Sequence, residues 1–121
     1  MHIISSDEDQ DLVIDIYVGF TKQDDLIISC ERSDYNDPRD NLTTAAIVKK
    51  HDARLIARNH HIPYRDIPQL VYDAMSRHRE IINPTPQQVI DCFKEITECL
   101  LDEGCRFRII RTHADSNTLF R

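Results

Sequence analysis

Glycine is scarce in this sequence: the 121 residues include only Gly19 and Gly104. A loop that cradles phosphate needs several backbone positions without a Cβ, so a P-loop and a G-x-G-x-x-G turn are both excluded. We therefore expect no dinucleotide site, no conventional nucleoside-triphosphate site and no cofactor.

Long apolar runs are missing as well. The run Leu12–Ile14 stops at Asp15, and the run Ala45–Val48 stops at Lys49, whereas a membrane helix needs roughly 18 apolar residues. The first residues place no basic segment ahead of an apolar one, as a signal peptide would. These absences predict a cytoplasmic protein that has no membrane partner.

Closely paired cysteines are also absent. None of the cysteines is spaced C-x-x-C, and Cys92 and Cys99 fall two turns apart on one predicted helix, which is too far for a disulfide. We expect reduced thiols that pack mostly as small hydrophobic side chains. The adjacent His60 and His61 point in different directions and have no third ligand at useful spacing, so we predict no metal site. The four cysteines are Cys30, Cys92, Cys99 and Cys105.

The composition is that of one globular domain over residues 1–121, with 40% hydrophobic and 30% charged residues. The net charge of −6 is unevenly spread: residues 1–40 hold eleven acids and three bases, and residues 41–79 hold three acids and seven bases. An acidic chain repels nucleic-acid phosphates. The basic middle segment nevertheless keeps nucleic acid open as a partner.

Alternating apolar residues predict four strands. Leu12, Ile14, Ile16 and Val18 fall on one face of an extended segment, which is the period of a half-buried strand over residues 12–18. The same alternation predicts strands at 26–31 and 105–111, and a short edge strand at 2–5. We expect segments 12–18 and 26–31 to pair as an antiparallel hairpin.

A helical period of apolar residues predicts three helices, at 42–59, 67–79 and 85–103. A break in the first helix at Asp52, which gives two shorter helices, is the alternative. The third helix has the clearest signals, because Thr85 opens a capping box and Gly104 supplies a helix stop. This order predicts an α+β fold: a small, mostly antiparallel sheet of three N-terminal strands plus one C-terminal strand, with three helices packed on one face.

Signatures of catalysis are not found in the sequence. No local motif of nucleophilic chemistry surrounds Cys30 or Cys92. The acidic residues between 7 and 11 lack the glycine and the terminal glutamate of a calcium loop. We interpret them, and the acidic loop at 34–40, as solvated turns, and we predict that the chain is not an enzyme.

A partial match to a helix-turn-helix lies within residues 45–72 and supports an alternative function, a nucleic-acid-binding regulatory module. His61 occupies the turn position that usually requires glycine, and Pro63 and Pro68 fall where a recognition helix begins and continues. A plain helix hairpin packed on the sheet explains the same apolar pattern. The matching positions are Ala57, Ile62, Ile67 and Leu70.

Three basic residues, Lys50, Arg54 and Arg58, are spaced four apart, so a helix places them in one row outside the apolar arc. The row is either a solvated helix face or a contact surface for phosphate or for an acidic protein, including the acidic end of another copy.

A second candidate surface is the sheet face that points away from the helices, which an apolar strip would cross. Such a strip is often covered by a partner, although scattered exposed apolar residues are also normal. We therefore predict a non-enzymatic protein-interaction domain that binds another protein or itself. The strip consists of Val13, Tyr17, Ile27 and Ile110.

Overall fold

The computed structural model describes residues 1–7 and 11–113 and has the predicted α+β fold. Its described part contains one antiparallel sheet of five strands and four α-helices, one more of each than the sequence predicted. The strands pair in chain order and are β1 (His2–Ser5), β2 (Leu12–Phe20), β3 (Leu26–Asp34), β4 (Leu42–Val48) and β5 (Arg108–His113). The helices are α1 (Lys50–His60), α2 (Ile67–Ala74), α3 (Ser76–Arg79) and α4 (Pro86–Asp102), with 3-10 turns η1 (Pro38–Asp40) and η2 (Tyr64–Asp66).

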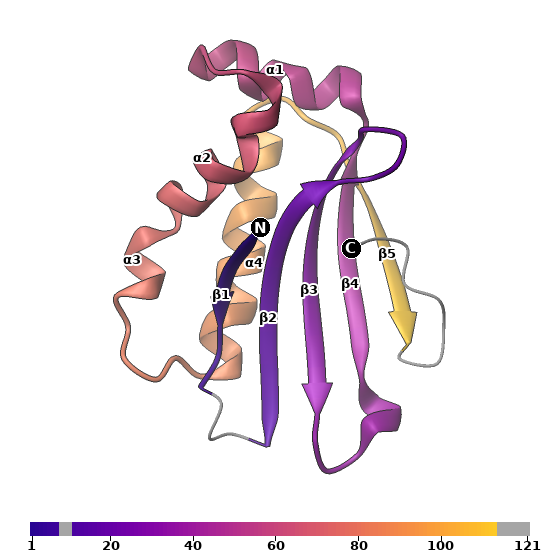
Figure 1. Cartoon of the computed structure of the whole chain (residues 1–121), viewed down its shortest axis with the longest axis vertical. Coiled ribbons are helices and arrows are strands. Elements are labelled where there is room, and N and C mark those ends of the chain that lie inside the picture. The colour runs from indigo at the N-terminus through magenta and orange to yellow at the C-terminus, as the bar shows by residue number, and fades with distance from the viewer. Residues whose placement is uncertain (8–10, 114–121) are drawn as a thin grey trace.

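The core lies between the sheet and helix α4, which crosses behind β1 and β2 in Figure 1. The predicted strands at 2–5, 12–18 and 26–31 are confirmed, and β2 pairs with β3 so that Ile16 meets Cys30 and Val18 meets Ile28. The apolar residues of alternate positions therefore share one face. They pack against one stripe of α4, made of Val89, Cys92, Phe93, Ile96 and Leu100.

Helix α4 is confirmed close to its predicted limits. Thr85 Oγ1 accepts a hydrogen bond from the backbone N–H of Gln88 at 3.2 Å, and Gln88 Oε1 accepts one from the N–H of Thr85 at 2.8 Å. Gly104 has a φ of 86°, the left-handed conformation that ends a helix. The predicted helix 67–79 is instead divided at Met75 into α2 and α3.

The helix predicted at 42–59 is wrong in its first half. Residues 42–48 form strand β4, which lies between β3 and β5, and helix α1 begins only at Lys50. Ala45–Val48 are all buried, so the side chains on both faces of this part of the strand are shielded from solvent. A strand buried on both faces has a continuous apolar run that periodicity does not distinguish from a helix. The β-branched residues Thr43, Thr44, Ile47 and Val48 favour the strand.

Two further features bear on the sequence predictions. No helix of the described residues is long and apolar enough to cross a membrane. The last strand begins at Arg108 rather than at residue 105, and the acidic turn predicted between residues 7 and 11 falls partly outside the described residues.

Candidate functional site

The predicted basic row on α1 is divided by the structure. Arg54 and Arg58 are exposed and have no ion-pair partner among the described residues. Lys50 is half-buried: its Nζ lies 2.9 Å from Asp24 Oδ2 and 5.9 Å from the centre of the Tyr64 ring. Only Arg54 and Arg58 are therefore open to a partner.

Lys50 belongs to a cluster of contacts that holds the β2–β3 turn against α1. Asp24 contacts Lys50 and also Arg65 Nη1, at 2.5 Å, and its backbone oxygen accepts a hydrogen bond from Tyr64 Oη at 2.8 Å. The hydrogen bond from Lys50 is the main reason that the pKa of Asp24 lies below its usual value. Arg65 also lies over the Phe20 ring, 4.8 Å from its centre.

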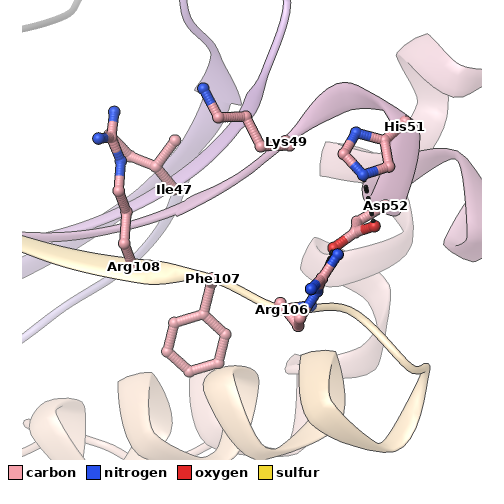
Figure 2. Close-up of a pocket in the computed structure, with 7 residues that line it drawn as sticks. All are labelled: Ile47, Lys49, His51, Asp52, Arg106, Phe107 and Arg108. Carbon is pink, nitrogen blue, oxygen red and sulfur yellow. Dashed lines mark hydrogen bonds and ion pairs between the residues drawn. The ribbon is translucent and has the colours of Figure 1, made fainter.

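A pocket of about 270 Å³ lies beside the N-terminus of α1, where three chain segments meet (Figure 2). Strand β4 ends there, helix α1 begins, and the chain enters β5. The pairing of Ile47 with Arg108 brings the end of β4 and the start of β5 together. The lining residues are Ile47, Lys49, His51, Asp52, Arg106, Phe107 and Arg108.

The rim of this pocket is predominantly basic. Figure 2 shows Lys49 and Arg108 extending to the same side as Ile47, whereas Phe107 extends to the other side, where it packs on the core. Side-chain exposure is 61% for Lys49 and 86% for Arg106. We call the lining bases and the two open residues of α1 the basic surface; it comprises Lys49, His51, Arg54, Arg58, Arg106 and Arg108.

One carboxylate, that of Asp52, lies within this pocket. Its Oδ2 accepts a hydrogen bond from the backbone N–H of Arg106 at 3.3 Å and lies 3.5 Å from Arg106 Nε, and its Oδ1 lies 3.0 Å from His51 Nε2. Asp52 therefore holds the segment before β5 against α1. Because Lys49 Nζ lies 3.8 Å from Asp25 Oδ2, Arg108 is the one lining base without an ion-pair partner among the described residues.

The predicted apolar strip is on the outer sheet face but offers little open surface. Strand β4 separates Ile27 from Ile110 and adds Ala45 and Ile47 between them. Val13 is only 5% exposed and Ile27 only 4%. Self-association through this face stays a prediction, with the half-buried Tyr17 and Ile110 as its accessible members.

The segment predicted as a helix-turn-helix contains α1, η2 and α2. Ala57 and Ile67 are buried, and Ile62 and Leu70 are half-buried, so its apolar positions face the core. Its first residues, 45–48, are strand rather than helix. Nucleic-acid binding by this segment stays a hypothesis.

Ser5, His2 and Asp15 form the one cluster that resembles a catalytic triad among the described residues. Ser5 Oγ lies 2.7 Å from His2 Nε2, and the same Nε2 lies 3.1 Å from Asp15 Oδ1. A triad uses the two ring nitrogens for different partners. This cluster lacks that geometry, and Ser5 also donates directly to Asp15.

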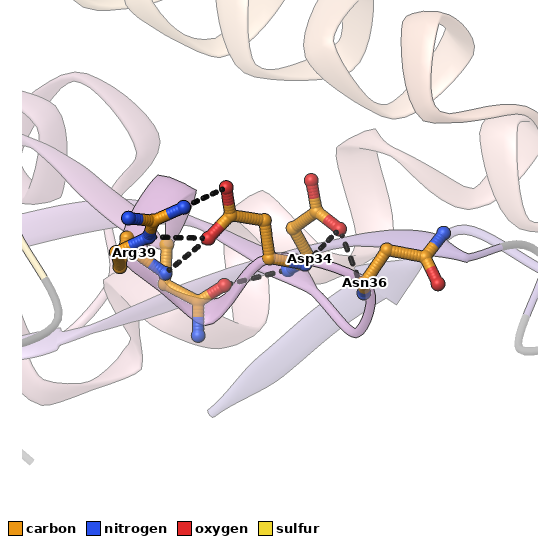
Figure 3. A network of polar contacts seen from close by, with 5 residues as sticks. Asp34, Asn36 and Arg39 are labelled. Carbon is orange, nitrogen blue, oxygen red and sulfur yellow. Dashed lines mark hydrogen bonds and ion pairs between the residues drawn. The ribbon is translucent and has the colours of Figure 1, made fainter.

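The remaining candidate groups take structural roles. Asp34 Oδ1 accepts hydrogen bonds from the backbone N–H groups of Asn36, at 2.9 Å, and Asp37, at 3.1 Å (Figure 3). Asp37 Oδ1 in turn accepts a bond from Arg39 Nε at 3.0 Å. These carboxylates close the β3–β4 loop. The described residues contain no cluster of three or more histidine, cysteine and acidic side chains suited to a metal ion.

Sequence reasoning found Arg54 and Arg58 but missed the four bases around the pocket. Their signals are visible as the run Lys49–His51 and as Arg106 and Arg108 flanking Phe107. Their proximity depends on the pairing of β4 with β5, which the predicted helix at 42–48 excluded. No protein-family model, no curated protein and no solved structure matches this chain.

Proposed function

We propose that this chain is a non-enzymatic interaction domain that binds an acidic segment of a partner protein through the basic surface. The observation that carries the proposal is the convergence of Lys49, His51, Arg106 and Arg108 on one pocket that contains a single carboxylate. Arg108 of this pocket and Arg54 and Arg58 of α1 have no ion-pair partner among the described residues. In a chain of net charge −6, this local positive charge attracts an anionic partner.

The surroundings of the pocket favour a protein partner. Arginine side chains bind carboxylates and phosphates alike through two parallel hydrogen bonds, and the neighbouring Ile47 is buried, so the acidic groups around the surface decide between the two kinds of partner. A long polyanion would also approach the acidic groups next to the surface, including Asp24 and Asp25. A short acidic segment can contact Arg54, Arg58 and Arg108, which have no ion-pair partner among the described residues, without meeting these carboxylates.

The test compares two anionic probes, a fluorescent oligoglutamate peptide and a single-stranded oligothymidine of equal charge. We expect the peptide to bind more tightly, with an affinity that falls as salt rises. The triple variant Arg54→Gln, Arg106→Gln and Arg108→Gln should bind it at least about tenfold more weakly, if each lost charge contributes about 0.5 kcal/mol.

A matched control removes three exposed charges elsewhere, through Lys22→Gln, Arg32→Gln and Lys94→Gln. This variant should keep the affinity of the unmodified chain. Equal losses in both variants would show a response to net charge alone and contradict the proposal. Tighter binding of oligothymidine would favour the nucleic-acid-binding module instead.

A further inference from the structure

Strand β1 leaves one edge of the sheet open. It is the first strand in the sheet order and pairs with β2 alone among the described strands. The backbone N–H of Ser6 donates to Ile14 O on β2 at 2.9 Å, and the N–H of Asp7 donates to Pro84 O on the opposite side, also at 2.9 Å. Because consecutive residues of an extended chain alternate in this way, the backbone N–H and C=O of Ser5 point away from β2.

A groove of about 340 Å³ runs along this open edge. All four residues of β1 form one wall. The opposite wall is built from Tyr72 of α2, Arg79 of α3, and Ile81 and Pro84 of the connection to α4. Figure 1 shows α2, α3 and this connection beside β1. The bond from Asp7 to Pro84 joins the two walls near the end of β1.

The second wall presents a fixed cation next to an apolar side chain. The Arg79 guanidinium carbon lies 3.5 Å from the centre of the Tyr72 ring, and Nη1 donates to Tyr72 O at 2.5 Å. These contacts hold the guanidinium in place and leave other N–H donors for an anion. Ile81 is 38% exposed although it is a large apolar residue.

From these observations we propose that the groove binds an extended peptide segment of a partner protein, which adds as a strand to β1. The backbone of the segment pairs with the open edge of β1, as in other complexes formed by strand addition. Its apolar side chain packs on Ile81, and an acidic side chain two residues away pairs with Arg79. Alternate side chains of a strand share one face, so this spacing suits both contacts.

This site goes beyond the proposed function, because β1 and β5 are opposite edges of the sheet and the basic surface adjoins β5. The two sites can therefore be tested independently. Unlike the basic surface, the groove requires a specific backbone conformation of its ligand as well as charge.

The probe is an N-acetylated, C-amidated peptide in which a central glutamate is flanked by threonines and then valines. Binding to the isotope-labelled full chain is followed by NMR. We expect shifts concentrated at the Ser5 amide and at Arg79, and slower hydrogen exchange of the Ser5 amide. Arg79→Gln should weaken binding about tenfold, as should Ile81→Ser, which removes the apolar contact and adds no charge beside Arg79. Arg32→Gln is the matched control and should leave binding unchanged.

A peptide N-methylated at alternate residues keeps the glutamate but loses the donors needed for strand pairing. It should fail to bind. Equal binding by this peptide, or shifts centred on Arg106 and Arg108, would overturn the groove proposal while leaving the basic surface standing. If the β1 edge instead pairs with a second copy, sedimentation will show a dimer that the peptide does not dissociate, and the proposal is likewise overturned. Loss of oligoglutamate binding in the Arg79 variant would show that the two sites are not separate.

Discussion

The carboxylate of Asp25 caps helix α1 from the neighbouring hairpin: its Oδ1 accepts a hydrogen bond from the backbone N–H of Lys50 at 2.9 Å. Asp25 is buried at the end of the β2–β3 turn, and its Oδ2 lies 3.8 Å from Lys49 Nζ. The first residue of α1 thus depends on a side chain far away in the sequence. The negative charge also complements the positive end of the helix dipole.

Replacement of Asp25 by alanine should lower the free energy of unfolding by about 1–2 kcal/mol, because it removes a buried helix cap. Asp25→Asn keeps an oxygen acceptor and should lose less. Denaturant unfolding measures both, with Asp11→Ala, an exposed position, as the control. Equal stability of the Ala variant and the unmodified chain would contradict the capping role.

The neighbouring Asp24 should make stability depend on pH. Its folded-state pKa lies below the ordinary value of 3.8, mainly because Lys50 donates a hydrogen bond to it. A lowered folded pKa contributes stability above the unfolded pKa, and this contribution is lost as pH falls through the folded value. The stability advantage of the unmodified chain over Asp24→Asn should therefore shrink below about pH 4. Unfolding curves at several pH values test this, and a constant difference would contradict it.

The four thiols should differ in reactivity. All are free: Cys92 and Cys105 are buried, Cys30 is half-buried and Cys99 is exposed. Burial raises the pKa of Cys30 to about 12, and those of Cys92 and Cys105 to about 11. Because the thiolate is the reactive form, iodoacetamide should modify Cys99 first in the native protein and four thiols after denaturation without reductant. Only two reactive thiols after denaturation would reveal a disulfide.

The elements that the sequence predicted well carry local signals. The hairpin of β2 and β3 follows from strict alternation, and α4 from the capping box at Thr85 and the stop at Gly104. Strand β4 has no such signal, because burial on both faces makes Ala45–Val48 uniformly apolar. Periodicity therefore could not separate this strand from a helix, and its one local signal was the β-branched residues Thr43, Thr44, Ile47 and Val48.

The candidate sites also differ in how far local sequence signals could predict them. Helical spacing was enough to place Arg54 and Arg58 on one face. The bases around the pocket meet only because β4 pairs with β5, so Lys49 and Arg106 come from distant parts of the chain. The groove at β1 likewise depends on how the connection before α4 docks against Asp7. Tertiary pairing of this kind leaves no periodic trace in the sequence.

Self-association through the outer sheet face should depend on Ile110, which is half-buried, rather than on Ile27, which is nearly inaccessible. We expect light scattering at micromolar concentration to show a dimer that Ile110→Lys weakens. Ile82→Lys, at an 87% exposed position outside the sheet, controls for the general loss of an apolar residue. A strict monomer at these concentrations would contradict the prediction.

The division of the basic row on α1 predicts opposite phenotypes for its members. The Lys50 side chain is 39% exposed and pairs with Asp24, so Lys50→Gln should cost up to about 1 kcal/mol of stability, the upper range for a partly exposed ion pair. Arg54→Gln with Arg58→Gln should change stability by only a few tenths of a kcal/mol, as is usual at exposed positions. Oligoglutamate binding should show the reverse order, because of the three residues in the row only Arg54 and Arg58 belong to the basic surface. Chemical unfolding and peptide titration of the same variants measure both quantities. If Lys50→Gln weakened binding as much as the double variant without loss of stability, all three residues would form one contact row, and the role of Lys50 as an anchor of the β2–β3 turn would be wrong.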